Sequence, residues 1–258
     1  MRPKIYLFGD SITEHSFGDG GWGASLAHHF ARNADVAIRG YSGYNTRWAL
    51  MAIDKVFPPP PPATAENGIN GGGGGGYEAA PVCVTVFFGA NDASLPNRHA
   101  AFQHVPIDEY KQNLHSIVSF FKKRWPSTHV ILITPPPIDE ATRILNAYVK
   151  NKSGLPERTN ESAGNYAKAC VTVASNCGIP VIDLWTKMQQ SPDWRTDYLC
   201  DGLHLTPGGN EVVFEEVIGK LNELGVTPES LPSELPPFIN IDSNDPLTSL
   251  SKWSSFMV

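Results

Sequence analysis

The 258-residue chain has no long hydrophobic run. Its first apolar run, from Ile5 to Phe8, is far shorter than the roughly 7–15 residues of a signal-peptide core, and polar residues follow it. No other run approaches the length of about 20 residues that a membrane-spanning helix needs. The sequence therefore predicts a protein without a membrane span, and we expect a cytoplasmic location by default.

Cysteine pairs and excess positive charge are also missing. The four cysteines, Cys83, Cys170, Cys177 and Cys200, have no CxxC spacing, so neither a zinc site nor a disulfide framework is indicated. The 20 Lys and Arg residues are outnumbered by 26 Asp and Glu residues, which gives a formal charge of -6. No overall positive field draws this chain to nucleic acid, and we expect no nucleic-acid partner.

Short apolar runs alternate with longer stretches of helical periodicity, which is typical of parallel strands joined by crossover helices. The predicted strands are Ile5–Phe8, Val36–Ile38, Val82–Phe88, Val130–Thr134 and Pro180–Leu184. The predicted helices lie near residues 22–32, 46–57, 107–125, 160–177 and 207–224. We expect an α/β fold, a three-layer α/β/α sandwich around a mainly parallel five-stranded sheet of the flavodoxin-like type.

One domain, residues 1–225, accounts for these elements. Residues 58–81 combine a proline run with a glycine run and lack the GK[ST] of a phosphate loop, so they are predicted to form a flexible insertion. This insertion enters the amino end of the third strand, whereas ligands of open α/β sheets bind at carboxyl ends. Residues 226–258 are predicted to form an irregular tail that packs on the domain through apolar residues such as Leu231 and Phe238.

Clusters of polar residues follow the first three predicted strands. Gly9-Asp10-Ser11 follows the first strand, residues 39–46 (RGYSGYNT) follow the second, and Gly89-Ala90-Asn91-Asp92 follows the third. A fourth cluster, Asp201-Gly202-Leu203-His204, lies just before the last predicted helix. Because parallel strands have their carboxyl ends at one edge of the sheet, we expect the four clusters to meet there.

Together, these clusters contain the parts of a serine hydrolase. Hydrolysis by a serine needs a base to take its proton, a carboxylate to orient that base, and donors for the developing oxyanion. Ser11 supplies the hydroxyl, His204 the base and Asp201 the carboxylate. The backbone N–H groups of Ser11 and Gly43 and the side-chain amide of Asn91 could make the oxyanion hole. This mechanism proceeds through an acyl-Ser11 intermediate and requires no metal or organic cofactor.

These residues resemble the GDSL or SGNH family of esterases and lipases, whose sequence blocks centre on a Ser, a Gly, an Asn and a final Asp-x-x-His. All four blocks occur here in the family's order, from about residue 4 to 222, as GDSI, GYSG, GAND and DGLH. Ile12 replaces the family's Leu, a swap of similar volume. The stretches GDGGWG, RGYSGYNTRWA and FFGAND are similar to the isoamyl acetate-hydrolysing branch, which is intracellular and acts on small esters. The resemblance implies an SGNH-hydrolase fold and a small-molecule ester substrate.

Other residues near these blocks allow two interpretations. Trp22, Tyr44 and Arg47 could line the acyl or alcohol pocket, or could equally be packing residues. Asp10 and Asp92 are predicted to be structural, because each follows a strand where its carboxylate can bond backbone in the turn.

Three histidines near the amino end raise the question of a metal site. His28 and His29 are neighbours on a predicted helix, so their side chains point about 100° apart. We interpret His15, His28 and His29 as surface histidines and predict no metal ligands.

Rival enzyme classes fit less well. Residues 40–44 (GYSGY) miss the G-x-S-x-G of another serine-hydrolase fold, because Tyr44 stands where the second glycine belongs. Residues 18–23 match G-x-G-x-x-G, but this motif begins ten residues after Phe8 and Arg39 stands where an acidic residue should close the next strand. A carbohydrate O-acetylesterase or an acyltransferase on the same scaffold remains an alternative, and a non-catalytic binding protein is a third class. The sequence makes no prediction of oligomeric state.

Overall fold

The computed structural model describes residues 2–57, 80–146, 151 and 153–253, so most of the predicted insertion at 58–81 lies outside the described residues. Its strands are β1 Lys4–Gly9, β2 Asp35–Gly40, β3 Cys83–Phe87, β4 His129–Ile133 and β5 Val181–Ile182. They form one parallel sheet in the order β2-β1-β3-β4-β5, which is the flavodoxin-like order. The predicted fold class is confirmed.

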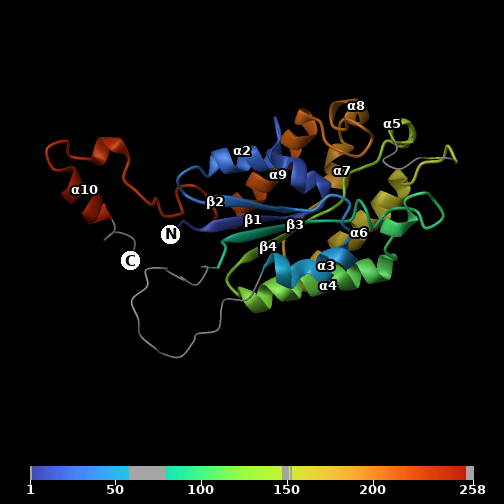
Figure 1. Cartoon of the computed structure of the whole chain (residues 1–258), viewed down its shortest axis with the longest axis horizontal. Helices are drawn as coiled ribbons and strands as arrows, with labels where there is room; N and C mark the ends of the chain where they lie inside the picture. Colours follow the sequence, from blue (N-terminus) through green and yellow to red (C-terminus); the bar gives the residue numbers. More distant parts are fainter. Residues whose placement is uncertain (1, 58–79, 147–150, 152, 254–258) are drawn as a thin grey trace.

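Helices cover both faces of the sheet (Figure 1). One layer contains α2 (Trp22–His29), α7 (Leu184–Met188) and α9 (Pro207–Glu223), and the other contains α3 (Thr46–Val56), α4 (Ile107–Arg124) and α6 (Asn160–Cys177). The remaining elements are α1 (Ser11–Glu14), η1 (His15–Phe17), η2 (Ala101–Gln103), α5 (Glu140–Leu145), α8 (Trp194–Asp197), η3 (Phe238–Asn240) and α10 (Pro246–Trp253). The sandwich thus has three layers, as the sequence predicts.

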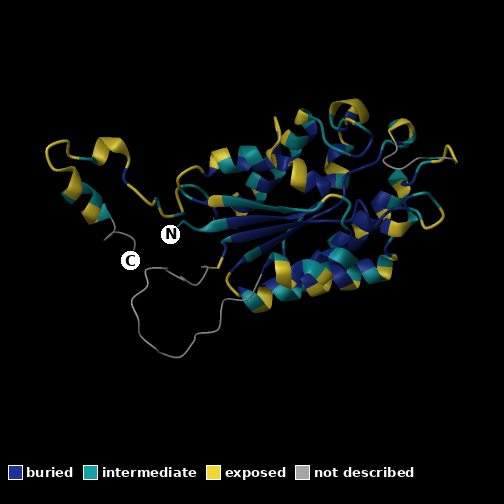
Figure 2. Cartoon of the chain, viewed as in Figure 1, coloured by how far each residue is buried: buried dark blue, intermediate teal, exposed yellow. Residues whose placement is uncertain are grey.

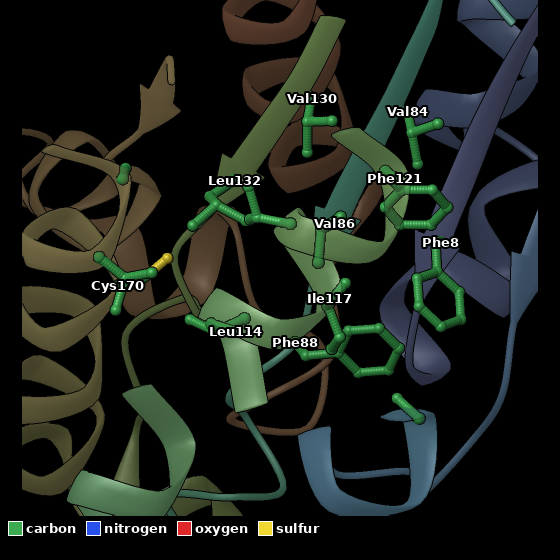
Figure 3. Close-up of a cluster of buried hydrophobic side chains, with 14 of the residues drawn as sticks. Phe8, Val84, Val86, Phe88, Leu114, Ile117, Phe121, Val130, Leu132 and Cys170 are labelled. Atoms are coloured by element: carbon green, nitrogen blue, oxygen red, sulfur yellow. The ribbon is translucent and has the colours of Figure 1, made fainter. Parts of the chain in front are cut away.

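The sheet is buried on both faces because each strand places alternate side chains in two separate cores. In β1, Tyr6 and Phe8 belong to one core, and Ile5 and Leu7 belong to the other. Figure 3 shows the first core, where Phe8 and other strand side chains pack against α4. Full burial of such an apolar side chain contributes roughly 1.5–3 kcal/mol, so the strands provide a rigid base for the loops at their carboxyl ends.

Strand β5 is shorter than predicted. The sequence suggests a strand over Pro180–Leu184, but the strand ends at Ile182. Asp183 is the N-cap of α7, and its side chain accepts a hydrogen bond from the Thr186 N–H. An apolar run that looks like one strand is therefore divided between a strand and a helix by a capping aspartate.

The tail packs on the domain only through its first part. Val226 is buried in one of the two cores and Leu231 packs against that core, whereas Phe238 is 86% exposed. The carbonyls of Leu235 and Pro236 accept hydrogen bonds from Arg32 at the edge of the domain. Pro237 is extended, and the chain then leaves the domain surface, as Figures 1 and 2 show. The expectation that Phe238 packs on the domain is therefore wrong, and the expectation of an irregular tail is wrong for α10, which is helical from Pro246 to Trp253.

No helix within the described ranges combines the length and the apolar character that crossing a membrane requires.

Candidate active site

The predicted site residues meet at the carboxyl edge of the sheet. Ser11 is the first residue of α1, directly after β1, and Asn91 follows β3. The strand order changes direction between β1 and β3, and ligands of open α/β sheets bind at such a switch point. A cavity of about 260 Å³ lies here, and its walls include Ser11, Gly43, Asn91 and the Asp201–His204 turn.

A hydrogen-bonded chain joins a hydroxyl, an imidazole and a carboxylate across this cavity. Ser11 Oγ lies 2.9 Å from His204 Nε2, and His204 Nδ1 lies 2.8 Å from Asp201 Oδ2. A carboxylate only accepts hydrogen bonds, so Nδ1 carries the proton and Nε2 is left to accept the hydroxyl proton of Ser11. This geometry has the order that a serine nucleophile, its base and the orienting acid require.

The Asp201–His204 turn is rigid because its own backbone donates two hydrogen bonds to the Asp201 side chain. Its Oδ1 accepts hydrogen bonds from the backbone N–H groups of Leu203 (3.0 Å) and His204 (2.7 Å). Partial burial favours the neutral acid, but the hydrogen bond and charge of His204, the backbone bond and the Arg143 guanidinium together outweigh burial. They hold the pKa of Asp201 well below its usual range. The acid is therefore ionised in the pH range in which histidine acts as a base.

The three residues expected to supply oxyanion donors, Ser11, Gly43 and Asn91, all line the cavity. As the first residue of α1, Ser11 has a backbone N–H without an acceptor inside the helix. Gly43 lines the cavity with a φ of +79°, a backbone conformation that favours glycine. Asn91 Oδ1 accepts hydrogen bonds from Arg158 and Gln103 (3.0 Å each), which fixes the orientation of the amide.

The amide nitrogen of Asn91 has two hydrogens, and its short hydrogen bond goes to the Tyr44 carbonyl at 2.9 Å. Its second contact, with Asp10 Oδ2, is 3.5 Å long. A substrate oxygen in the cavity can therefore compete for one N–H of this amide.

Asp10 and Asp92 occupy structural positions beneath the site. Asp10 is the N-cap of α1 and accepts a hydrogen bond from the Ile12 N–H at 3.0 Å. Asp92 accepts hydrogen bonds from the N–H and the hydroxyl of Thr46. Burial raises the pKa of Asp10 to about 6 and that of Asp92 to about 7. These contacts agree with the structural interpretation of both residues.

The three suggested pocket residues do not line the cavity. Trp22 is fully buried in a core and donates its ring N–H to the Ile12 carbonyl, so it packs beneath α1. Arg47 forms a bidentate pair with Glu109 (2.5 and 2.7 Å), and Tyr44 packs against Trp48. The suggestion that Trp22, Tyr44 and Arg47 line the pocket is corrected accordingly.

Several residues that line the cavity are missing from the sequence-based site. His15 is exposed, but its ring centre lies 5.9 Å from that of His204, at the cavity wall. Gln103, Arg143, Glu157 and Arg158 also line the cavity. They come from α5, η2 and a loop, and no motif spacing in a single sequence identifies them. His15 could have been found from its position four residues after Ser11.

No three His, Cys, Asp or Glu side chains gather as a metal site in the part of the chain that the structure describes.

Known proteins resemble the chain over nearly its whole length. A family model described as GDSL-like lipase/acylhydrolase matches residues 5–217. The chain belongs to the GDSL lipase/acylhydrolase family. This GDSL hydrolase is 59% identical over 253 residues to "GDSL esterase/lipase At5g45920" of Arabidopsis thaliana. The matched residues cover 98% of this chain and 100% of that protein.

Further relatives agree with this membership. The human "Isoamyl acetate-hydrolyzing esterase 1 homolog" is 42% identical over 251 residues, covering 97% of this chain and 92% of that protein. The crystal structure of a lipase/acylhydrolase from Enterococcus faecalis superposes with a TM-score of 0.62 at 25% identity, covering 92% of this chain and 100% of that one. The GDSL protein described here is thus a carboxylic ester hydrolase.

Proposed function

We propose that this GDSL hydrolase cleaves small or short-chain carboxylic esters through an acyl-Ser11 intermediate. The observation that carries this proposal is the chain of short hydrogen bonds from Ser11 through His204 to Asp201 at the wall of a cavity. The order of the three groups supports Ser11 as nucleophile, His204 as general base and Asp201 as the acid that orients it.

In the proposed reaction, Ser11 Oγ attacks the ester carbonyl carbon while His204 Nε2 takes the hydroxyl proton. The developing oxyanion accepts hydrogen bonds from the N–H groups of Ser11 and Gly43 and from the Asn91 amide. The tetrahedral intermediate then collapses, and His204 returns the proton to the leaving alkoxide, which departs as the alcohol. Water, deprotonated by His204, attacks the acyl group and releases the carboxylic acid and free Ser11.

Two features of the cavity support a small substrate. Its volume of about 260 Å³ leaves little room for a long acyl chain. Ala100 and Leu203 are the only apolar side chains among the described residues that line it, so a long alkyl chain would find no continuous wall of apolar side chains. The similarity to a protein named for hydrolysing isoamyl acetate also supports a small ester. That resemblance carries a further proposal, a cytoplasmic location, which cell fractionation would test.

The polar lining of the cavity favours a second candidate function. Hydroxyl groups of an acetylated carbohydrate could bond to side chains such as His15 and Asn146 at the cavity wall. The same acyl-Ser11 intermediate could also transfer its acyl group to an alcohol instead of water. Faster release of acetate from acetylated xylan than from simple acetates would favour the O-acetylesterase, and an acyl product on an added alcohol would favour the transferase.

The test is hydrolysis of a nitrophenyl ester series, from acetyl to decanoyl, by the wild type, Ser11→Ala and Ser116→Ala. Ser116 is an exposed serine of α4 and serves as the matched control. We expect activity to peak at short chains, to fall by about 10⁴-fold or more in Ser11→Ala and to stay unchanged in Ser116→Ala. Full activity of a folded Ser11→Ala protein would overturn the proposal, and a decanoyl optimum would overturn its substrate class.

A further inference from the structure

A buried ion network lies behind the Ser11–His204–Asp201 chain. Arg143, on the short helix α5, has a side chain only 2% exposed, and that of Glu157 is 1% exposed. The Arg143 Nε donates a hydrogen bond to Glu157 Oε1 (2.8 Å), and Arg143 Nη2 forms an ion pair with the same oxygen (2.7 Å). Its remaining nitrogen, Nη1, lies 2.8 Å from Asp201 Oδ2. One arginine thus holds a buried glutamate and the acid of the proposed triad at the same time.

The contact with Asp201 involves the oxygen that faces the base. Asp201 Oδ2 accepts from both His204 Nδ1 and Arg143 Nη1, each at 2.8 Å. Asp201 Oδ1 is occupied by the two backbone N–H groups of its own turn. Arg143 therefore fixes the position of Asp201 Oδ2 relative to the imidazole ring.

The network continues to the proposed oxyanion hole. Glu157 Oε1 also accepts from Arg158 Nη1 at 2.8 Å. Arg158 Nη2 donates to Asn91 Oδ1 (3.0 Å) and to Gln103 Oε1 (2.8 Å). The guanidinium groups and carboxylates of Arg143, Arg158, Glu157 and Asp201 balance in charge, so this polar layer can be buried without an uncompensated ion.

Helix α5 is also packed tightly on the Asp201–His204 turn. The Asp139 N–H donates to the Gly202 carbonyl at 3.0 Å. Gly202 has a φ of +84°, and a Cβ there would lie 2.5 Å from the Asp139 carbonyl oxygen and 2.8 Å from the backbone nitrogen of Arg143. Only glycine allows this approach, which brings the backbone of Arg143 beside the turn that holds the acid and the base.

From this geometry we infer that Arg143 is a positioning residue for catalysis, which acts through Asp201 and, with Glu157 and Arg158, joins the triad and the oxyanion hole into one preorganised unit. The inference rests on the proposed function. Arg143 fixes the distance and direction of the Asp201–His204 hydrogen bond, on which the tautomer and the orientation of the base depend. The bidentate fork of a guanidinium group suits this bridge between two carboxylates, whereas a lysine ammonium group would act as a single point charge.

A double-mutant cycle tests whether Arg143 acts through Asp201. The cycle compares wild type, Arg143→Met, Asp201→Asn and the double variant, with rates on the best nitrophenyl ester corrected for the residual rate of Ser11→Ala. We expect Arg143→Met to lower kcat by about 10- to 100-fold and to change KM by less than about threefold. In the Asp201→Asn background, the same substitution should lower kcat by less than about threefold.

The matched control is Arg2→Met. Arg2 also contacts two carboxylates, those of Asp35 and Glu234, but it is 36% exposed and lies at the amino end of β1. We expect wild-type kcat and KM for Arg2→Met. If Arg143→Met does not fold, Arg143→Lys takes its place in the cycle, with an expected loss of about 3- to 30-fold in kcat that is absent in the Asp201→Asn background.

The outcomes separate this inference from the proposed function. Equal losses in both backgrounds, an effect on KM alone, or wild-type kcat in the folded Arg143 variant would overturn the role of Arg143. In those cases an inactive Ser11→Ala variant would still support the proposed function. Full activity of Ser11→Ala would instead overturn the proposed function, and the inference with it.

Discussion

Two arginines of this chain each contact two carboxylates, yet their surroundings differ. Arg2 contacts Asp35 (3.3 Å) and Glu234 (2.9 Å) at the amino end of the sheet, and its side chain is 36% exposed. Arg143 contacts Asp201 and Glu157 near the carboxyl end, and its side chain is 2% exposed. Exposed pairs contribute about 0–1 kcal/mol because water screens them, whereas breaking a buried pair leaves a charge without compensation.

The same contrast holds for the two edges of the sheet. The amino edge carries the tail, whose Phe238 and Ile239 are 86% and 79% exposed, and Figures 1 and 2 show this segment extending beyond the domain. The carboxyl edge carries the cavity, where buried polar side chains bond to one another. Similar ion pairs are therefore exposed and incidental at the amino edge, whereas at the carboxyl edge they are buried and contact residues of the proposed site.

The largest expected difference between the two edges is in kcat, and it separates variants of Asp201 at the carboxyl edge from variants of Asp35 at the amino edge. Asp201→Asn should lower kcat by about 10³- to 10⁴-fold, because the amide can no longer hold the base in the required tautomer. Asp35→Asn should leave kcat unchanged. Steady-state kinetics with a short-chain nitrophenyl ester measures both, and similar activities of the two folded variants would break the comparison.

The next largest difference is in the free energy of unfolding, and it separates variants of Glu157 from variants of Glu234. Glu157→Gln should lower the free energy of unfolding by about 3–5 kcal/mol, because two buried guanidinium groups lose their shared partner. Glu234→Gln should lower it by less than about 1 kcal/mol, because that carboxylate is 48% exposed. Urea denaturation followed by tryptophan fluorescence gives both values. A cost at Glu157 no greater than that at Glu234 would contradict our view of the buried network.

Asp92 is a buried acid whose side-chain hydrogen bonds come from Thr46 rather than from an arginine. Burial raises the pKa of Asp92 to about 7, and the pKa of an unfolded aspartate is about 3.9. Between these pH values the folded protein binds a proton that the unfolded chain has released. The contribution of Asp92 to stability is therefore fully present below about pH 4 and is lost as pH rises towards 7, by on the order of 4 kcal/mol.

Asp92→Asn should remove this pH dependence. Relative to wild type, the variant should gain stability between pH 5 and pH 8, which urea denaturation at the two pH values measures. A difference in stability between the two proteins that stays constant from pH 5 to 8 would show that Asp92 does not titrate in this range.

The smallest difference concerns two glycines with positive φ. Gly202 (φ +84°) is crowded by α5, whereas a Cβ at Gly225 (φ +74°), beyond α9, would have no atom within 4 Å. Gly225→Ala should cost about 1 kcal/mol in backbone strain, and Gly202→Ala about 2–3 kcal/mol, because α5 must also move. Thermal unfolding measures the costs, and kcat should fall only in Gly202→Ala. Equal costs with unchanged kcat would show that α5 does not depend on this close approach.

The strands, the main helices and the meeting of the polar clusters could be predicted from the sequence. The first two follow from hydrophobic periodicity, and the third follows because parallel strands have their carboxyl ends at one edge of the sheet. Ser11 and Asn91 lie a few residues beyond the ends of buried strands, and their meeting at one edge could be predicted without any coordinates. Thr206 and Pro207 also mark the start of α9, since a capping threonine and a proline at the first helical position have a direct backbone reason.

Other parts could not be predicted because they depend on contacts across the chain. Arg143 bonds to Glu157 and Asp201, which lie 14 and 58 residues away, and its helix is too short to have a recognisable period. Trp22 stands beside the predicted site in sequence, but its side chain turns into the core. The tail contains apolar residues, yet apolar character alone did not tell which of them the domain would cover.

The most direct test of the central claim is labelling with an active-site phosphonylating reagent, a fluorophosphonate, followed by peptide mass spectrometry. The reagent forms a phosphorus–oxygen bond to an activated serine and releases fluoride, so it reports the nucleophile itself. We predict a single adduct on the peptide that contains Ser11, no adduct in Ser11→Ala, and labelling slowed by at least about 100-fold in His204→Ala. An adduct on another residue, or equal labelling of Ser11→Ala, would contradict the account.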